Sequence, residues 1–204
     1  FEGVEADANE LLGWSGEDRT YFTFSGVLEV DTWDRLVFPR SGVQILGKTE
    51  WGESGDFSHH VLDVDAAVPL SSTVSLRGRA VAGTSDGDDL PSQYLFFIGG
   101  ANPFYLYPDR QLSFVGQRVM ESRGRHVQML DIGLQWEVIP NIFAFGRWNT
   151  AALPEEWGFD TDDFITGFGA GVGLTSRLGF GRLMVTGGSA ADAVRLEIDL
   201  GYLF

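Results

Sequence analysis

Hydrophobic and polar residues alternate with a period of two along most of the chain. In residues 194–204, one face carries only apolar side chains, which are Val194, Leu196, Ile198, Leu200, Tyr202 and Phe204. The opposite face carries Arg195, Glu197 and Asp199. Because successive side chains of a strand point to opposite sides, this pattern predicts a strand with one apolar face. Its length matches the roughly 9–11 residues that a tilted strand needs to cross a membrane.

Eight further segments are extended in character, although the pattern is weaker in 142–149 and 180–186. They are 20–30, 42–51, 61–70, 73–82, 128–138, 142–149, 164–175 and 180–186. The sequence therefore predicts an all-β fold of about nine strands without a helix. In segment 164–175, four glycines share one face and leave room there for a bulky group, namely Gly167, Gly169, Gly171 and Gly173.

The predicted connections alternate between short and long. The short ones are 69–72, 139–141 and about 176–179, and the long ones are 52–57, 83–123, 150–163 and 187–193. Short turns at one end and long polar loops at the other are typical of outer-membrane barrels.

Alternation alone does not separate a membrane barrel from a soluble one, which has its apolar face inside. Long strands and aromatic residues at strand ends favour the membrane barrel, and these aromatics are Tyr21, Trp51, Trp136, Trp148 and Tyr202. We therefore expect an antiparallel transmembrane β-barrel with charges lining its lumen, including Arg77, Arg79, Asp131, Glu137, Arg195 and Glu197. Opposite charges on adjacent strands lie within pairing reach, so these residues are expected to brace the interior rather than to filter ions.

The strand count predicts more barrel upstream. Single-chain bacterial barrels have an even number of strands and begin on the short-turn side, whereas nine strands traced back from Phe204 begin on the long-loop side. Residues 1–17 are acidic and lack alternation, so we interpret them as an acidic loop or the end of a preceding barrel region. Residues 18–204 are interpreted as the C-terminal part of the barrel.

Composition excludes several classes of protein. The 204 residues include no cysteine, which rules out disulfides and thiolate metal sites. A formal net charge of −15 without a basic cluster argues against nucleic-acid binding. No apolar run approaches the roughly 18–20 residues of a spanning helix, and no signal peptide is evident, so the N-terminus is a mature end or a cut inside a longer chain.

Chemical motifs are weak. Residues 83–87 match the G-x-S-x-G pattern around Ser85, but nothing after them predicts the helix that a nucleophile elbow requires. His59 and His60 are adjacent and would point to opposite faces of a strand, so they cannot chelate one metal ion. We predict no catalytic residue, metal or cofactor. Two alternatives stay open, a self-contained small barrel that binds a hydrophobic ligand and an esterase that uses Ser85.

Residues 34–42 resemble a turn of the BamA-like, bacterial surface-antigen barrel superfamily, an aspartate followed by Phe-Pro-x-x-Gly. The matching residues are Asp34, Phe38, Pro39 and Gly42. Gly99 and Gly100 resemble the point where those barrels enter a large lumen-facing loop, and residues 99–105 are most similar to barrels fused to patatin-like phospholipases. The Arg-Gly-Phe tip of translocating members is absent between Gly99 and Arg123.

The resemblance implies strands 8–16 of a 16-stranded barrel in the bacterial outer membrane. It implies a membrane anchor or passage for N-terminal periplasmic or passenger domains and no enzyme in this segment, although a hydrolase domain is compatible with the upstream region. The implied partners are the lipid bilayer, lipopolysaccharide, the outer-membrane assembly machinery, the remaining barrel strands and the periplasmic domains. Leu200, Tyr202 and Phe204 resemble the terminal signal that this machinery reads.

Overall fold

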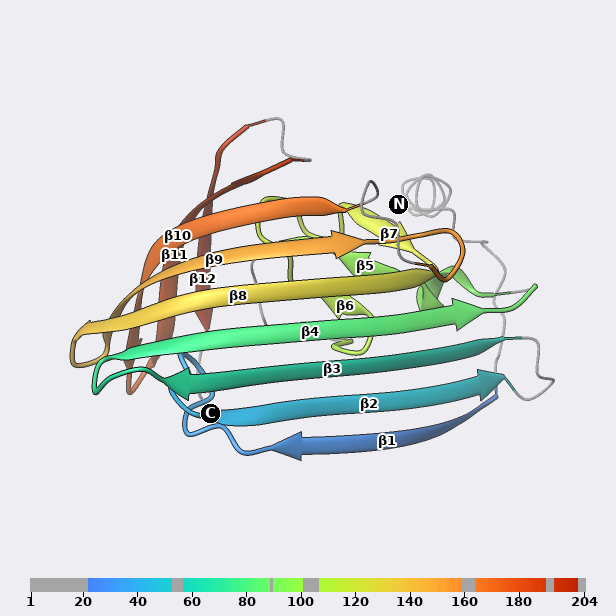
Figure 1. The fold of residues 1–204 in the computed structure, drawn as a ribbon, viewed down its shortest axis with the longest axis horizontal. Helices are drawn as coiled ribbons and strands as arrows, with labels where there is room; N and C mark the ends of the chain where they lie inside the picture. Colours follow the sequence, from blue (N-terminus) through green and yellow to red (C-terminus); the bar gives the residue numbers. More distant parts are fainter. Residues whose placement is uncertain are drawn as a thin grey trace, which may run out of the picture.

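The structure is a computed structural model that describes residues 22–52, 57–88, 90–100, 107–158, 164–189 and 193–201. Its regular elements are β1 (Thr23–Asp31), β2 (Gly42–Gly52), β3 (Ser58–Pro69), β4 (Val74–Asp86), the 3-10 turn η1 (Ser92–Tyr94), β5 (Phe96–Ile98), β6 (Gln111–Leu112), β7 (Ser122–Gly124), β8 (His126–Ile139), β9 (Ile142–Ala152), β10 (Ile165–Ser176), β11 (Gly179–Gly188) and β12 (Arg195–Gly201) (Figure 1). Within these ranges, no helix is long and apolar enough to cross a membrane.

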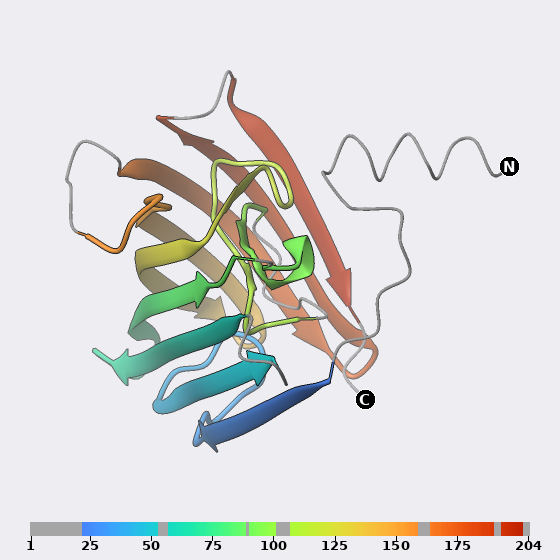
Figure 2. The ribbon, with the colours of Figure 1, turned by 90° about the vertical axis from the view of Figure 1, so that its right-hand side faces the viewer.

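Nine of these strands form one antiparallel sheet in the order β1-β2-β3-β4-β8-β9-β10-β11-β12. All nine predicted strands are confirmed, with ends shifted by a few residues. The sheet curls strongly, so that β1 and β12 turn toward each other around an interior that holds the β5–β7 segment (Figure 2). In the described part of the chain β1 and β12 do not pair, so the sheet is not closed.

The convex face of the sheet is apolar and the concave face is charged. Leu134 of β8 is 50% exposed on the convex side, whereas Asp131 of the same strand is 2% exposed on the concave side. The apolar residues Leu196, Ile198 and Leu200 of β12 are likewise exposed. A soluble barrel would show the reverse, so this polarity is that of a membrane barrel and does not support the alternative of an apolar, ligand-filled interior.

The long connection between β4 and β8, residues 87–125, is called the interior loop below, and its described residues, 87–88, 90–100 and 107–125, lie on the concave side. The sequence predicted no strands here, but β5 pairs with β6 and β7 in a small sheet of its own. Strands of two or three residues are too short to show a period.

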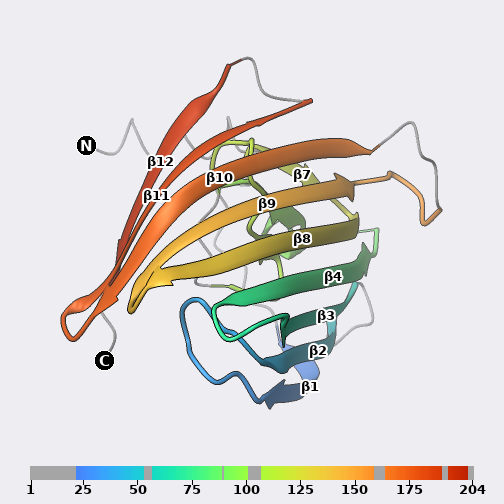
Figure 3. The same cartoon turned by 60° about the vertical axis from the view of Figure 1, so that its left-hand side comes forward.

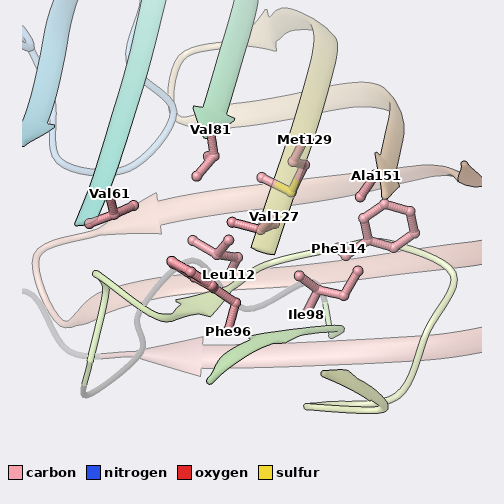
Figure 4. Packing of buried hydrophobic residues seen from close by; sticks show 9 residues of the cluster. All are labelled: Val61, Val81, Phe96, Ile98, Leu112, Phe114, Val127, Met129 and Ala151. Atoms are coloured by element: carbon pink, nitrogen blue, oxygen red, sulfur yellow. The ribbon is translucent and has the colours of Figure 1, made fainter. Parts of the chain in front are cut away.

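The hydrophobic core lies where the interior loop meets the curved sheet (Figure 4). Four loop residues pack against five wall residues: Phe96, Ile98, Leu112 and Phe114 against Val61, Val81, Val127, Met129 and Ala151. Phe96 and Ile98 are fully buried, and burying such side chains contributes roughly 1.5–3 kcal/mol each. The loop is therefore part of the folded core and occupies the half of the interior near the long connections.

The glycines of β10 give the interior segments room to approach the wall. A β-carbon at Gly167 would lie 1.8 Å from the carbonyl oxygen of Val115 in the interior loop. A β-carbon at Gly173 would lie 2.1 Å from the ring of Phe38. The prediction that this glycine face accommodates something bulky is confirmed at both ends of the strand.

A Gly167→Ala substitution is expected to displace the interior loop, because the nearest atom to the new methyl group would be the backbone carbonyl oxygen of Val115, which cannot rotate away. The loop would then be cut faster by trypsin at its arginines, which are Arg110, Arg118, Arg123 and Arg125. Gly78→Ala is the matched control, because no atom lies within 4 Å of its new methyl group. Equal cleavage rates in the two variants would contradict this packing.

Candidate functional site: the charged interior and the two segments inserted into it

A series of ion pairs lines the concave face of the central strands. On β3 and β4, Arg77 forms a two-pronged contact with Asp65, and Arg79 donates to Asp63 from Nε and Nη2 at 3.0 and 2.6 Å. Each arginine pairs with a diagonal neighbour, since Arg79 lies directly opposite Asp65 in the register. Diagonal pairs suit the long guanidinium side chain.

The series continues on later strands. Arg147 of β9 lies 2.5 Å from Asp131 of β8, and Arg182 of β11 lies 2.7 Å from Asp199 of β12. Asp131 is almost fully buried, and a buried carboxylate needs such a partner. Together with the pairs on β3 and β4, these contacts form the ion-pair ladder, which runs around the concave wall.

Three of the predicted lumen charges do not join this ladder: two of them hold inserted segments, and one pairs with a neighbouring strand of the wall. Glu137, at the end of β8, lies 3.5 Å from Arg35 and 3.8 Å from Arg40 in the β1–β2 turn. Arg195 of β12 lies 3.1 Å from Glu121 of the interior loop. Glu197 accepts a hydrogen bond of 2.7 Å from Thr186 on β11.

The interior loop is fixed to the wall through Lys48 on β2. Its Nζ atom lies 2.8 Å from Asp109 of the loop and 2.7 Å from Glu50 of β2. Burial alone would raise the pKa of Asp109, but Lys48 and Arg110 hold it below its ordinary value. The Asp109 carboxylate is therefore held by one cation of the wall, Lys48, and one of the loop, Arg110.

Tyr94 forms a second attachment of the loop. Its hydroxyl group donates to Glu50 at 2.8 Å, and burial together with this carboxylate raises the pKa of Tyr94 to about 12. The guanidinium of Arg110 stacks over the rings of Tyr94 and Tyr107, at 4.7 and 5.3 Å from their centroids. A cation above an aromatic face adds to the attachment.

The β1–β2 connection, residues 32–41, is called the floor turn below. Asp34 accepts hydrogen bonds from the backbone N–H groups of Arg40 and Ser41 at 2.8 and 3.1 Å, which closes the turn. Burial alone would raise the pKa of Asp34, but these two hydrogen bonds hold it below its ordinary value. At the end of the turn, Gly42 has φ +117°, and a β-carbon there would lie 2.4 Å from the carbonyl oxygen of Thr32.

Phe38 is the part of the floor turn that enters the interior. It is only 8% exposed, and its ring stacks on Phe143 of β9 at a centroid distance of 4.5 Å. A cavity of about 390 Å³ lies next to it. Phe38 and Pro39 line one side of this cavity, Pro108 of the interior loop lines another, and the rungs of the ion-pair ladder on β3 and β4 line the wall.

Comparison with known protein families shows to which family the chain belongs. The family model described as the OMP85 superfamily matches residues 5–204. The chain belongs to the OMP85 superfamily. The match spans the whole sheet, the floor turn and the interior loop, and it confirms the predicted fold class and the resemblance to BamA-like barrels. No curated protein sequence matches the chain.

Membership in the OMP85 superfamily gives the chain its general role. It is an outer-membrane β-barrel of a superfamily concerned with protein translocation and assembly, whose members contact the lipid bilayer. Among the described residues, no group of three histidine, aspartate or glutamate side chains could hold a metal ion.

Ser85 does not have the environment of a nucleophile in this OMP85 barrel. It lies within β4, not on a turn, and is fully buried. Its hydroxyl group donates to the carbonyl oxygen of Tyr94 at 2.7 Å, so the ring nitrogen Nδ1 of His59, also 2.7 Å away, must donate to Ser85. A general base would have to accept that proton, so the contact has the wrong direction for an esterase.

Gly99 and Gly100 do not mark the start of the long loop, as the resemblance to BamA-like barrels implied. Strand β4 ends at Asp86, so the interior loop begins at residue 87, and both glycines lie inside it, after β5. They have φ values of +134° and +75°, and a β-carbon at Gly99 would lie 2.0 Å from the carbonyl oxygen of Arg118. Glycine adopts such φ values without strain, which lets the backbone at Gly99 pass close to that of Arg118 within the loop.

The remaining predicted residues of the OMP85 chain lie at its ends. Leu200 points outward from β12 and is 82% exposed. Tyr202, Phe204 and the acidic segment 1–17 lie outside the described residues. Sequence reasoning did not predict that Lys48, Tyr94 and Asp109 attach the interior loop. Lys48 lies in a strand with a readable pattern, but the other two residues lie in the loop, where no period is visible.

Proposed function

We propose that this chain is the C-terminal part, strands 8–16, of a 16-stranded outer-membrane barrel. The barrel serves as the membrane anchor and passage for periplasmic or passenger domains located N-terminal to it. Within the superfamily we place it nearest the branch fused to patatin-like phospholipases, on the similarity of residues 99–105. Any hydrolytic activity would then reside in the upstream domain.

The observation that carries the proposal is the inverted polarity of the sheet in a chain of this superfamily. Apolar side chains cover the convex face, and paired charges line the concave one. The convex face suits contact with lipid hydrocarbon, and the concave face suits a water-filled interior.

Strand direction supports a larger barrel. Neighbouring strands of the nine-stranded sheet are antiparallel, so β1 and β12 run in the same direction. An antiparallel ring that contains both must add an odd number of strands between them, and seven more strands would satisfy this requirement. Those strands would come from the proposed upstream region.

The test is cell fractionation of the full-length protein in a Gram-negative host. The protein is expected in the outer-membrane fraction, soluble only after detergent extraction, and its upstream domain should be released from the membrane when residues 18–204 are deleted. A full-length protein that stays in the detergent-free soluble fraction would refute the anchoring role.

A further inference from the structure

We propose that the floor turn is a gate that closes the short-turn end of the lumen. The inference rests on the proposed function, in which the lumen is a passage. The turn would leave its position when the passage opens, while the strands that flank it stay in the sheet.

The first observation is how far the turn reaches. It connects β1 and β2, yet Phe38 contacts Phe143 on β9 and approaches Gly173 on β10. Strands β3, β4 and β8 lie between β2 and β9 in the sheet. The turn therefore crosses the interior instead of following its rim, as the blue connection in Figure 3 shows.

The second observation is that side-chain contacts hold the turn. Arg40 donates to the carbonyl oxygens of Ser71 and Ser72 in the β3–β4 turn, and Gln135 of β8 donates to the carbonyl oxygen of Phe38 at 3.1 Å. Arg35 and Arg40 both pair with Glu137, and the guanidinium of Arg77 lies 4.9 Å from the ring centroid of Trp33. These contacts are side-chain contacts that can break without disturbing the backbone hydrogen bonds between strands.

The backbone of the turn also favours a second state. Phe38 has φ +55°, a region that non-glycine residues seldom occupy unless surrounding contacts hold them there. The stack on Phe143 is such a contact. Once the ring leaves Phe143, the residue can return to an ordinary conformation, so release of the ring and movement of the turn are coupled.

The third observation is the location of the cavity. It lies between the floor turn and the interior loop, with Phe38 and Pro39 on one side and Pro108 on the other. Material that enters from the short-turn end would meet the floor turn first. The two inserted segments thus close the passage separately, and the charged cavity is the space between them.

The experiment measures access to this cavity in the purified full-length protein in lipid vesicles. Leu46 of β2 lines the cavity, and the 204 residues contain no cysteine, so Leu46→Cys adds a single thiol to this part of the protein. Its reaction rate with a charged maleimide is compared with and without Phe38→Ala. Because a stacked aromatic pair contributes up to about 1.5 kcal/mol, we expect labelling about tenfold faster when Phe38 is removed.

Two further variants complete the design. Arg40→Met removes the hydrogen bonds to Ser71 and Ser72 together with the ion pair to Glu137, and it should also accelerate labelling. Phe24→Ala removes an aromatic ring from the convex face, 67% exposed, and should leave the rate unchanged. Heat-dependent migration in SDS gels shows that each variant has a folded barrel.

The outcomes separate this inference from the proposed function. Unchanged labelling in folded Phe38→Ala and Arg40→Met variants recovered from the outer membrane would overturn the gate and leave the anchoring role intact. Acceleration in both variants, without an effect of Phe24→Ala, would support it. A protein that never reaches the outer membrane would overturn both.

Discussion

Replacing Arg147 with methionine is expected to lower the free energy of unfolding of the barrel by about 3–5 kcal/mol, the usual cost of removing one partner of a buried ion pair. Asp131 is 2% exposed, and Arg147 is the one salt-bridge partner it has among the described residues. Without the guanidinium, its carboxylate would remain buried without a direct partner, because Arg79, which lies opposite it on β4, is already paired with Asp63.

The measurement is urea unfolding of the protein in lipid vesicles, followed by tryptophan fluorescence. The control is the double variant Arg147→Met/Asp131→Leu, in which both charges are absent. Because apolar residues often replace a buried pair without loss, the double variant should recover most of the stability. If the double variant is less stable than Arg147→Met, the explanation by an uncompensated charge is wrong.

Ile132→Arg is expected to cost about 2–4 kcal/mol, because this side chain points outward from the middle of β8 and would carry its charge into hydrocarbon. Ile132 is 43% exposed. An exposed isoleucine on a soluble protein would tolerate arginine with a change of about 0.5 kcal/mol or less. The substitution therefore tests the orientation of the sheet directly.

Ile139→Arg is the matched control, because the same change is made on the same strand at its end, near the membrane surface. There the cost should fall to about 0–1 kcal/mol. Unfolding of both variants in the same vesicles gives the comparison. Equal, small effects at residues 132 and 139 would mean that this face of β8 does not contact lipid.

The strands and the polarity of the two faces could be predicted from the sequence because both depend on local alternation. In β8, Asp131 and Ile132 are neighbours in the chain, and Asp131 points to the concave side whereas Ile132 points to the convex side. Any strand of this length with such a pattern has one charged and one apolar face, so the period indicates which side chains share a face. Strand length and the aromatic residues at strand ends indicated that the apolar face is the outer one. The superfamily resemblance rested on a turn whose residues are close in sequence.

The inserted segments could not be predicted in the same way. The contact between Phe38 and Phe143 joins residues more than one hundred positions apart, and no local pattern indicates which strand the ring meets. The attachment of Asp109 to Lys48 depends on how the interior loop folds back. The partners within the ion-pair ladder could not be predicted either, because Arg79 pairs with the diagonal Asp63 and not with Asp65, which lies directly opposite it.

The unpaired edge of β1 has a consequence for how the chain enters a membrane. Alternate residues of this nine-residue strand present backbone N–H and C=O groups without a strand partner on that side among the described residues. Lipid tails offer no hydrogen bonds, and each unsatisfied backbone group in hydrocarbon costs several kcal/mol. Insertion and edge pairing must therefore be coupled, so that β1 enters the bilayer together with a neighbouring strand that pairs with its free edge.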